Sequence, residues 1–165
     1  MKLRILAPIA AVLLLGGAAL WFSGVGRPAG PPPYDEAADA RKDVAQALAS
    51  ARAANLPALV IFGANWCEDC RALDKSLKTT RNAELMAKEF VTVKVDVGNF
   101  NRNLDLTTQY GNPTKKGIPA AVLVSPAGEV VYSTRAGELS NARRMGDSGI
   151  FEFFRKVAEK APAKS

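Results

Sequence analysis

The apolar run Ala58–Phe62 constrains the fold of this chain more than any other feature of its sequence. The run contains no polar residue, includes β-branched side chains and ends at Gly63. Such a short continuous run is typical of a strand that is covered on both faces, as in the middle of a parallel sheet. One helix is predicted before it, over Asp35–Asn55, and another after it, beginning near Cys67. Phe90–Val97 alternates between valine and polar residues, which predicts a second strand with one drier face.

The second half of the chain predicts a hairpin and a closing helix. Apolar residues at Ala120–Val124 indicate a strand, and Ser125–Gly128 has the residues of a type I turn, with proline second and glycine fourth. Glu129–Ser133 is expected to return beside that strand, and Ile150–Lys160 carries an apolar face at helical spacing. The polar stretch Asn99–Tyr110 predicts at most one short helix.

The order of these elements is helix, strand, helix, strand, helix, hairpin, helix. Strand–helix–strand units imply parallel strands joined by right-handed crossovers, and the hairpin adds antiparallel strands at one side. We therefore predict an α/β fold, a three-layer sandwich in which a central mixed sheet carries helices on both faces. A further short helix is expected between Asn82, which would serve as its N-cap, and Lys88.

Two absences narrow the chemistry that the sequence can carry. It has no histidine, which excludes Ser-His and Cys-His catalysis and most transition-metal sites. It has only two cysteines, too few to supply the four nitrogen or sulfur ligands of a structural zinc site. The net charge is +6, but the basic residues are scattered and few aromatic residues lie among them. We therefore expect no metal, no cofactor and no nucleic acid as a partner.

The two cysteines lie in the segment Trp66-Cys67-Glu68-Asp69-Cys70, between a predicted buried strand and a predicted helix. At the start of a helix, free N–H groups and the helix dipole favour a thiolate at Cys67. Cys70 lies one turn later on the same side, within reach of the first sulfur. Cys67 is therefore predicted to attack a substrate disulfide, and Cys70 to resolve the mixed disulfide that results. A structural disulfide, or half of a metal site shared between two chains, are the alternatives.

Two segments together resemble the thioredoxin superfamily: Trp66–Cys70, and Gly117–Pro119 before a hairpin and a final helix. The resemblance covers the chain from the first predicted strand to the C-terminus. More narrowly, the chain looks like the membrane-tethered or periplasmic thioredoxin-like proteins of Gram-negative bacteria. The resemblance implies a thioredoxin-like sandwich in which Pro119 follows a cis bond and faces the cysteines. It also implies that the backbone of Ile118 pairs with a bound client chain, and that Trp66 shields the site.

The chain departs from that family at two points. Glu68-Asp69 stands between the cysteines, where thioredoxin has Gly-Pro and the strong oxidase of the family has Pro-His. The position six residues before Cys67 is Ile61, whereas thioredoxin has a buried carboxylate there. Glu68, Asp69 or water must then accept the proton of Cys70. The two acids are expected to oppose the Cys67 thiolate, which favours a reductant or isomerase over an oxidase.

Residues 1–26 are predicted to be a signal peptide or a signal anchor. A short basic start precedes the apolar run Ile5–Phe22, which is at the lower limit for spanning a bilayer and long for a signal-peptide core. No clean cleavage motif follows, so an uncleaved anchor is favoured over a cleaved signal, and both over a buried soluble helix. Residues 27–34 are rich in proline and predict a semi-rigid linker, and residues 35–165 are expected to form the thioredoxin-like domain.

The expected protein is a thiol–disulfide oxidoreductase of the periplasm, anchored in the inner membrane, or soluble there if the signal is cleaved. Its partners would be disulfide-containing exported proteins and a membrane or periplasmic electron donor, because the sequence has no flavin or nicotinamide motif. The alternative is a non-catalytic thioredoxin-fold adaptor or holdase, which would bind clients through the same groove with its cysteines locked in a structural disulfide.

Overall fold

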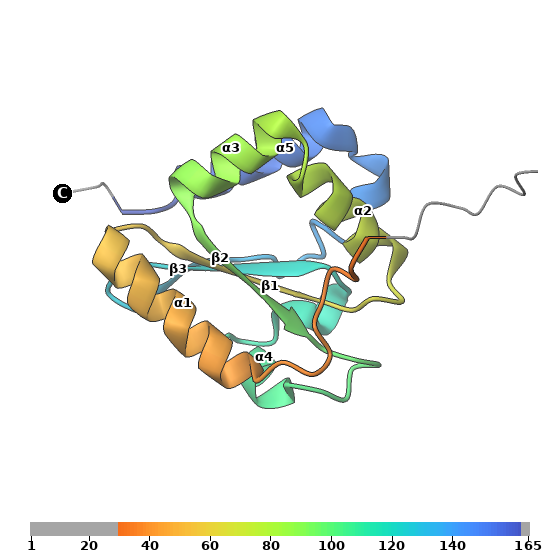
Figure 1. Cartoon of the computed structure of the whole chain (residues 1–165), viewed down its shortest axis with the longest axis horizontal. Coiled ribbons are helices and arrows are strands. Elements are labelled where there is room, and N and C mark those ends of the chain that lie inside the picture. Colours follow the sequence, from red (N-terminus) through yellow and green to blue (C-terminus); the bar gives the residue numbers. More distant parts are fainter. Residues whose placement is uncertain (1–29, 163–165) are drawn as a thin grey trace, which may run out of the picture. The chain divides into compact units, whose positions relative to one another are not determined.

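The computed structural model describes residues 30–162, and Figure 1 shows how their helices and strands are arranged. The predicted signal or anchor, residues 1–26, lies outside this range, as does the first part of the predicted linker. Within residues 30–162, no helix is both long enough and apolar enough to cross a membrane. Residues 31–162 belong to one compact unit.

A mixed sheet of four strands, in the spatial order β2-β1-β3-β4, forms the centre of this unit. The parallel pair consists of β1 and β2, while β3 is antiparallel to β1 and β4 is antiparallel to β3. This arrangement confirms the predicted mixed sheet, with the hairpin added at one side. The strands are β1 (Ala58–Gly63), β2 (Val91–Asp96), β3 (Ala120–Val124) and β4 (Val130–Ser133).

Helices cover both faces of the sheet, which confirms the predicted three layers (Figure 1). One face carries α2, α3 and α5, and the other carries α1 and α4. The helices are α1 (Ala40–Ala54), α2 (Glu68–Leu77), α3 (Thr80–Glu89), α4 (Leu104–Gln109) and α5 (Gly146–Ala158), with short 3-10 turns η1 (Pro113–Lys116) and η2 (Ala142–Arg144).

Strand β1 is buried at every residue, as its uninterrupted apolar sequence predicts. Its alternate side chains enter the two separate halves of the core, because successive residues of a strand point to opposite faces. Val60 and Phe62 pack on the side of α1, whereas Leu59 and Ile61 pack on the side of α2, α3 and α5. The end of β1 is therefore held from both sides, and the segment that follows it is placed on a rigid support.

Two helices begin at other residues than their sequences predict. Helix α1 begins at Ala40 instead of Asp35, because the side chain of Asp39 accepts the backbone N–H of Lys42 and caps the helix there. Helix α5 begins at Gly146, one turn before the predicted start at Ile150. The buried side chains of α5 nevertheless lie on its predicted apolar face.

Asn82 is not a helix cap. It lies inside α3, which begins at Thr80, and its side chain is buried. Its amide donates hydrogen bonds to the backbone carbonyls of Ser76 and Asp147, and so joins the end of α2 to the start of α5. An asparagine that holds two other elements together has the same local sequence signal as one that caps its own helix.

Candidate functional site

Cys67 and Cys70 lie where β1 gives way to α2. Cys67 is the N-cap of α2, with extended backbone angles, and Cys70 lies in the first turn of the helix. The backbone N–H of Cys70 donates a hydrogen bond to the Cys67 sulfur at 3.2 Å. Both cysteines are free thiols and both are buried, Cys70 completely. The helix start thus directs a backbone donor at Cys67, as its position in the sequence predicts.

The pKa of the Cys67 thiol is lowered from an ordinary value of 9.0 to about 7. The main cause is a hydrogen bond from the side chain of Cys70, supported by the backbone N–H groups of Cys70 and Asp69. Burial of Cys67 and the negative charge of Asp69 act in the opposite direction, but they do not outweigh these donors. The pKa of the Cys70 thiol is raised, first by the hydrogen bond to Cys67 and then by burial. Near neutral pH, Cys67 is therefore partly ionised to the thiolate, whereas Cys70 remains a thiol.

Arg143 pairs with both acids of the motif. Its guanidinium lies 3.1 Å from a carboxylate oxygen of Glu68 and 3.2 Å from one of Asp69, and its backbone N–H donates to Asp69 at 2.9 Å. The negative charge of Asp69 does raise the pKa of Cys67, as expected, but this effect is smaller than that of the hydrogen-bond donors. The hydrogen-bond donors therefore outweigh the opposing charge of Asp69, and the Arg143 cation faces both carboxylates.

The Ile118–Pro119 peptide bond is cis, as the resemblance implies. The backbone carbonyl of Ile118 accepts a hydrogen bond from the Cys67 thiol, at a sulfur–oxygen distance of 3.5 Å. Strand β3 begins directly afterwards, at Ala120, and pairs antiparallel with β1 through Phe62. This pairing places the end of the Gly117–Pro119 loop beside the end of β1, where the chain continues into α2.

Trp66 presents an exposed indole beside the cysteines, 53% exposed as a residue. Its ring N–H donates to the backbone carbonyl of Gly98 at 2.9 Å, and its ring lies edge-on to that of Phe100 at 6.0 Å between centroids. Phe100 is itself 45% exposed. Sequence reasoning missed Phe100, although an aromatic residue within the polar run 99–103 is a visible signal. We call these two rings the Trp66–Phe100 surface.

Tyr34 lies against Cys70 and was also missed. It is the last residue of the predicted linker, yet it is only 2% exposed and belongs to the core. Its backbone is fixed by Asn65, whose side chain accepts the N–H of Tyr34 at 3.0 Å and donates to its carbonyl at 2.9 Å. The Tyr34 hydroxyl and the Cys70 sulfur lie close together at Gly63, and their interaction contributes to the raised pKa of Tyr34 and acts to lower the pKa of Cys70. A single aromatic residue at the end of a proline run was the available signal.

Ile61 stands where thioredoxin has a buried carboxylate, as the sequence indicates. A different acidic residue, Asp74 of α2, lies on the same side of the sheet. Asp74 contacts Lys94 of β2, and it also pairs with Lys78 at 2.7 Å. Burial tends to raise the pKa of Asp74, but the hydrogen bonds from Lys78 and Lys94 lower it overall. Lys94 stands next to Ile61 in the register of β1 and β2.

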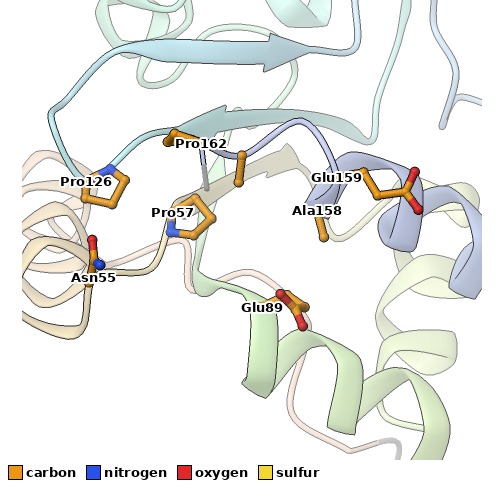
Figure 2. Close-up of a pocket in the computed structure, with 8 residues that line it drawn as sticks. Asn55, Pro57, Glu89, Pro126, Ala158, Glu159 and Pro162 are labelled. Carbon is orange, nitrogen blue, oxygen red and sulfur yellow. The ribbon is translucent and has the colours of Figure 1, made fainter. Parts of the chain in front are cut away.

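A separate pocket of about 210 Å³ lies at the other end of β1 (Figure 2). Figure 2 shows three prolines and two glutamates around it: Pro57, Pro126, Pro162, Glu89 and Glu159. Pro57 precedes β1 and Cys67 follows it, so the length of the strand, about 20 Å at 3.3 Å per residue, separates the pocket from the sulfurs. The pocket is therefore not part of the cysteine site.

Comparison with known proteins agrees with this geometry. A family model described as thioredoxin-like matches residues 39–126. A disulphide isomerase from Xylella fastidiosa Temecula1 is 55% identical, and the match covers 78% of this chain and 98% of that chain with a TM-score of 0.77. A comparison with curated protein sequences gave no match.

Two further solved structures show a likeness of fold alone. The C-terminal domain of DsbD from Neisseria meningitidis, in its reduced form, is 17% identical, with 72% of this chain and 96% of that chain covered and a TM-score of 0.55. A thioredoxin from Thermus thermophilus is 24% identical, with 70% and 84% covered and a TM-score of 0.54.

Proposed function

Because the chain belongs to the thioredoxin-like superfamily, we propose that it is a thiol–disulfide oxidoreductase that reduces or isomerises disulfides of exported proteins through Cys67 and Cys70. The observation that carries the proposal is the asymmetry of the two sulfurs. Cys67 has a pKa of about 7 at the start of a helix, and Cys70 stays protonated behind it. This is the combination that a nucleophile and a resolving thiol require.

The exchange takes place in two steps. In the first, the Cys67 thiolate attacks one sulfur of a client disulfide, and the other client sulfur leaves as a thiolate. In the second, Cys70 loses its proton and attacks the Cys67 sulfur, so that the mixed disulfide breaks and the reduced client departs. The chain is left with a Cys67–Cys70 disulfide, and a separate electron donor must reduce it. An isomerase instead releases the client with a rearranged disulfide after the first step.

A reducing or isomerising role is favoured over that of a strong oxidant. The reactive cysteine of thioredoxin has a pKa of about 7, whereas that of the strong oxidase is near 3.5. The Cys67 thiol has a pKa of about 7 and so resembles the former. The 55% identity to a disulphide isomerase supports the same choice.

We place the client at the end of the sheet where the site residues meet. The carbonyl of Ile118, beside Pro119, would accept a backbone N–H of an extended client segment, next to Cys67. The Trp66–Phe100 surface would bind apolar client side chains on the other side of the reactive sulfur. Large exposed aromatic rings suit this use, because they bury apolar area at little cost in side-chain freedom.

The proposed setting is the periplasm, with the chain anchored in the inner membrane by residues 5–22, or released there if the signal is cleaved. The basic start and the apolar run of the N-terminus support this setting. The proposed partners are exported proteins that contain disulfides and a membrane or periplasmic electron donor.

A trapping experiment tests the proposal. In Cys70→Ala the resolving thiol is missing, so client proteins should accumulate as mixed disulfides at Cys67, and Cys67→Ala should trap few. The wild type should also reduce insulin when a small dithiol supplies the electrons. If neither variant traps clients and insulin stays oxidised, the chain does not carry out the exchange, and the non-catalytic adaptor explains it better.

A further inference from the structure

Residues 31–39, which precede α1, form a strap that is held beside the cysteine site through Asn65. Within it, Tyr34 is fixed by a pair of hydrogen bonds between its backbone and Asn65, two residues before Cys67. The Asn65 amide also donates to Glu36 at 2.9 Å, so a second point of the strap is held. These contacts direct the Tyr34 side chain into the core, where only 2% of the residue is exposed.

The Tyr34 hydroxyl reaches Cys70 because β1 ends in a glycine. A β-carbon on Gly63 would overlap the hydroxyl oxygen and would lie 2.9 Å from the Cys70 sulfur, closer than a β-carbon comes to a non-bonded atom. The hydroxyl, the sulfur and Gly63 therefore meet at one point. Residues 61 and 63 share a face of the strand, so the hydroxyl lies on the face of β1 where Ile61 stands in place of an ionisable residue.

We infer that the Tyr34 hydroxyl donates a hydrogen bond to the Cys70 sulfur and stabilises its thiolate while Cys70 resolves the mixed disulfide, an inference that rests on the exchange proposed above. In this step Cys70 loses its proton, its sulfur forms a bond to the Cys67 sulfur, and the bond between Cys67 and the client breaks. The client sulfur leaves with the electron pair and takes up a proton, so the step needs no further oxidant or reductant.

Tyr34 acts in this step as a donor and not as a base. Burial, followed by the charges of the cysteines and Asp74, raises the pKa of Tyr34 well above 10, so the phenol keeps its proton. Two charged groups surround its ring: Asp74 on α2, and Lys94 on β2, whose ammonium lies 5.9 Å from the ring centroid. A neutral donor suits a buried sulfur that is a thiol in one step and a thiolate in the next, because hydrogen bonds to charged groups are the stronger ones.

The first test needs no catalysis. In Cys67→Ala the main cause that raises the Cys70 pKa is gone, and Cys70 can be titrated by the NMR chemical shift of its isotope-labelled β-carbon. Adding Tyr34→Phe, which removes only the hydroxyl, should raise the pKa of Cys70 by at least one unit, as expected for the loss of a hydrogen bond to a charged group. Tyr110→Phe is the matched control, because Tyr110 is also a buried tyrosine and its hydroxyl has no partner among the described residues.

The second test follows the reaction itself. Reduced protein is mixed with glutathione disulfide, quenched with acid and analysed by mass spectrometry for the mixed disulfide at Cys67. Tyr34→Phe should form this species at the wild-type rate but lose it at least tenfold more slowly, and Asn65→Ala, which loosens the strap, should slow the loss by a smaller factor. An unchanged Cys70 pKa, an unchanged rate of loss, or an equal slowing of both steps would overturn the role of Tyr34. A shifted Cys70 pKa in a protein that never reacts with disulfides would support the Tyr34 contact and reject the proposed function.

Discussion

The first prediction concerns what lowers the pKa of Cys67. The thiol falls from an ordinary value of 9.0 to about 7, which corresponds to about 2.7 kcal/mol in favour of the thiolate at 1.36 kcal/mol per unit. The main cause is the side chain of Cys70, and the backbone N–H of Cys70, at 3.2 Å, is a smaller one. Cys70→Ala removes the first donor and leaves the second in place.

We expect Cys70→Ala to raise the pKa of Cys67 to about 8 or above, because at least half of the shift depends on the lost thiol. At pH 7 the thiolate fraction should then fall from about one half to about one tenth. The assay is the rate of alkylation of Cys67 by iodoacetamide as a function of pH, since only the thiolate reacts. Cys70→Ser is the matched control, because its hydroxyl can still donate and the rise should be smaller.

The contrary outcome is a Cys70→Ala protein in which Cys67 still titrates near 7. The backbone donors and the dipole of α2 would then be sufficient by themselves, as they are for anions at other helix starts. The asymmetry of the pair would in that case arise from helix geometry and not from the contact between the two sulfurs.

Three further expectations concern charge, potential and location. Arg143→Gln removes the cation that pairs with Glu68 and Asp69, so the pKa of Cys67 should rise by a few tenths to about one unit, the size expected for partly exposed pairs. Arg144→Gln is the control. An alkylation profile of Arg143→Gln that equals that of the control would contradict this expectation. The reduction potential, measured against glutathione buffers, should lie nearer thioredoxin's, about −270 mV, than the strong oxidase's, about −120 mV, and a value above about −150 mV would show that other groups set it. Fractionation and mass measurement should find the mature protein in the membrane with residues 5–22 intact, and a soluble form that begins after about residue 20 would show cleavage.

The parts of the structure that sequence predicts well are those that depend on neighbouring residues. The buried strand Ala58–Phe62 and the helix start at Cys67 follow from local patterns, and both are present. The cis bond before Pro119 was expected from resemblance to a family, and it is present as well. For the strand and the helix start, the deciding information lies within a few adjacent residues, whereas the cis bond was expected from two separate segments taken together.

The remaining features of the site depend on contacts between distant parts of the chain. Arg143 reaches Asp69 across 74 residues, and Tyr34 reaches Asn65 across 31. In neither case does the local sequence decide the role, because an Arg-Arg pair in a loop and a tyrosine after prolines are both consistent with a solvated surface. The charge of Asp69 predicts that it raises the pKa of Cys67. The net direction of the pKa shift could not be predicted, because it depends on the hydrogen-bond donors that the fold brings to the sulfur.

The ionisations around the pair lead to a last prediction, about the pH dependence of the first chemical step. The Tyr34 phenol and the Cys70 thiol both have raised pKa values, and the side chain of Ile61 does not ionise. Among residues 30–162, the step near neutral pH is therefore assigned to Cys67, whose folded pKa lies below the ordinary value.

The rate at which the reduced protein attacks a small neutral disulfide should thus rise with pH through a single step centred near 7, and level off by about pH 9. Stopped-flow measurement of this rate, with hydroxyethyl disulfide as the substrate, gives the profile directly. Tyr34→Phe should leave the midpoint in place, because Tyr34 acts on Cys70 and not on the attacking sulfur. A profile with two separate steps near neutral pH would contradict the assignment of the step to Cys67 alone.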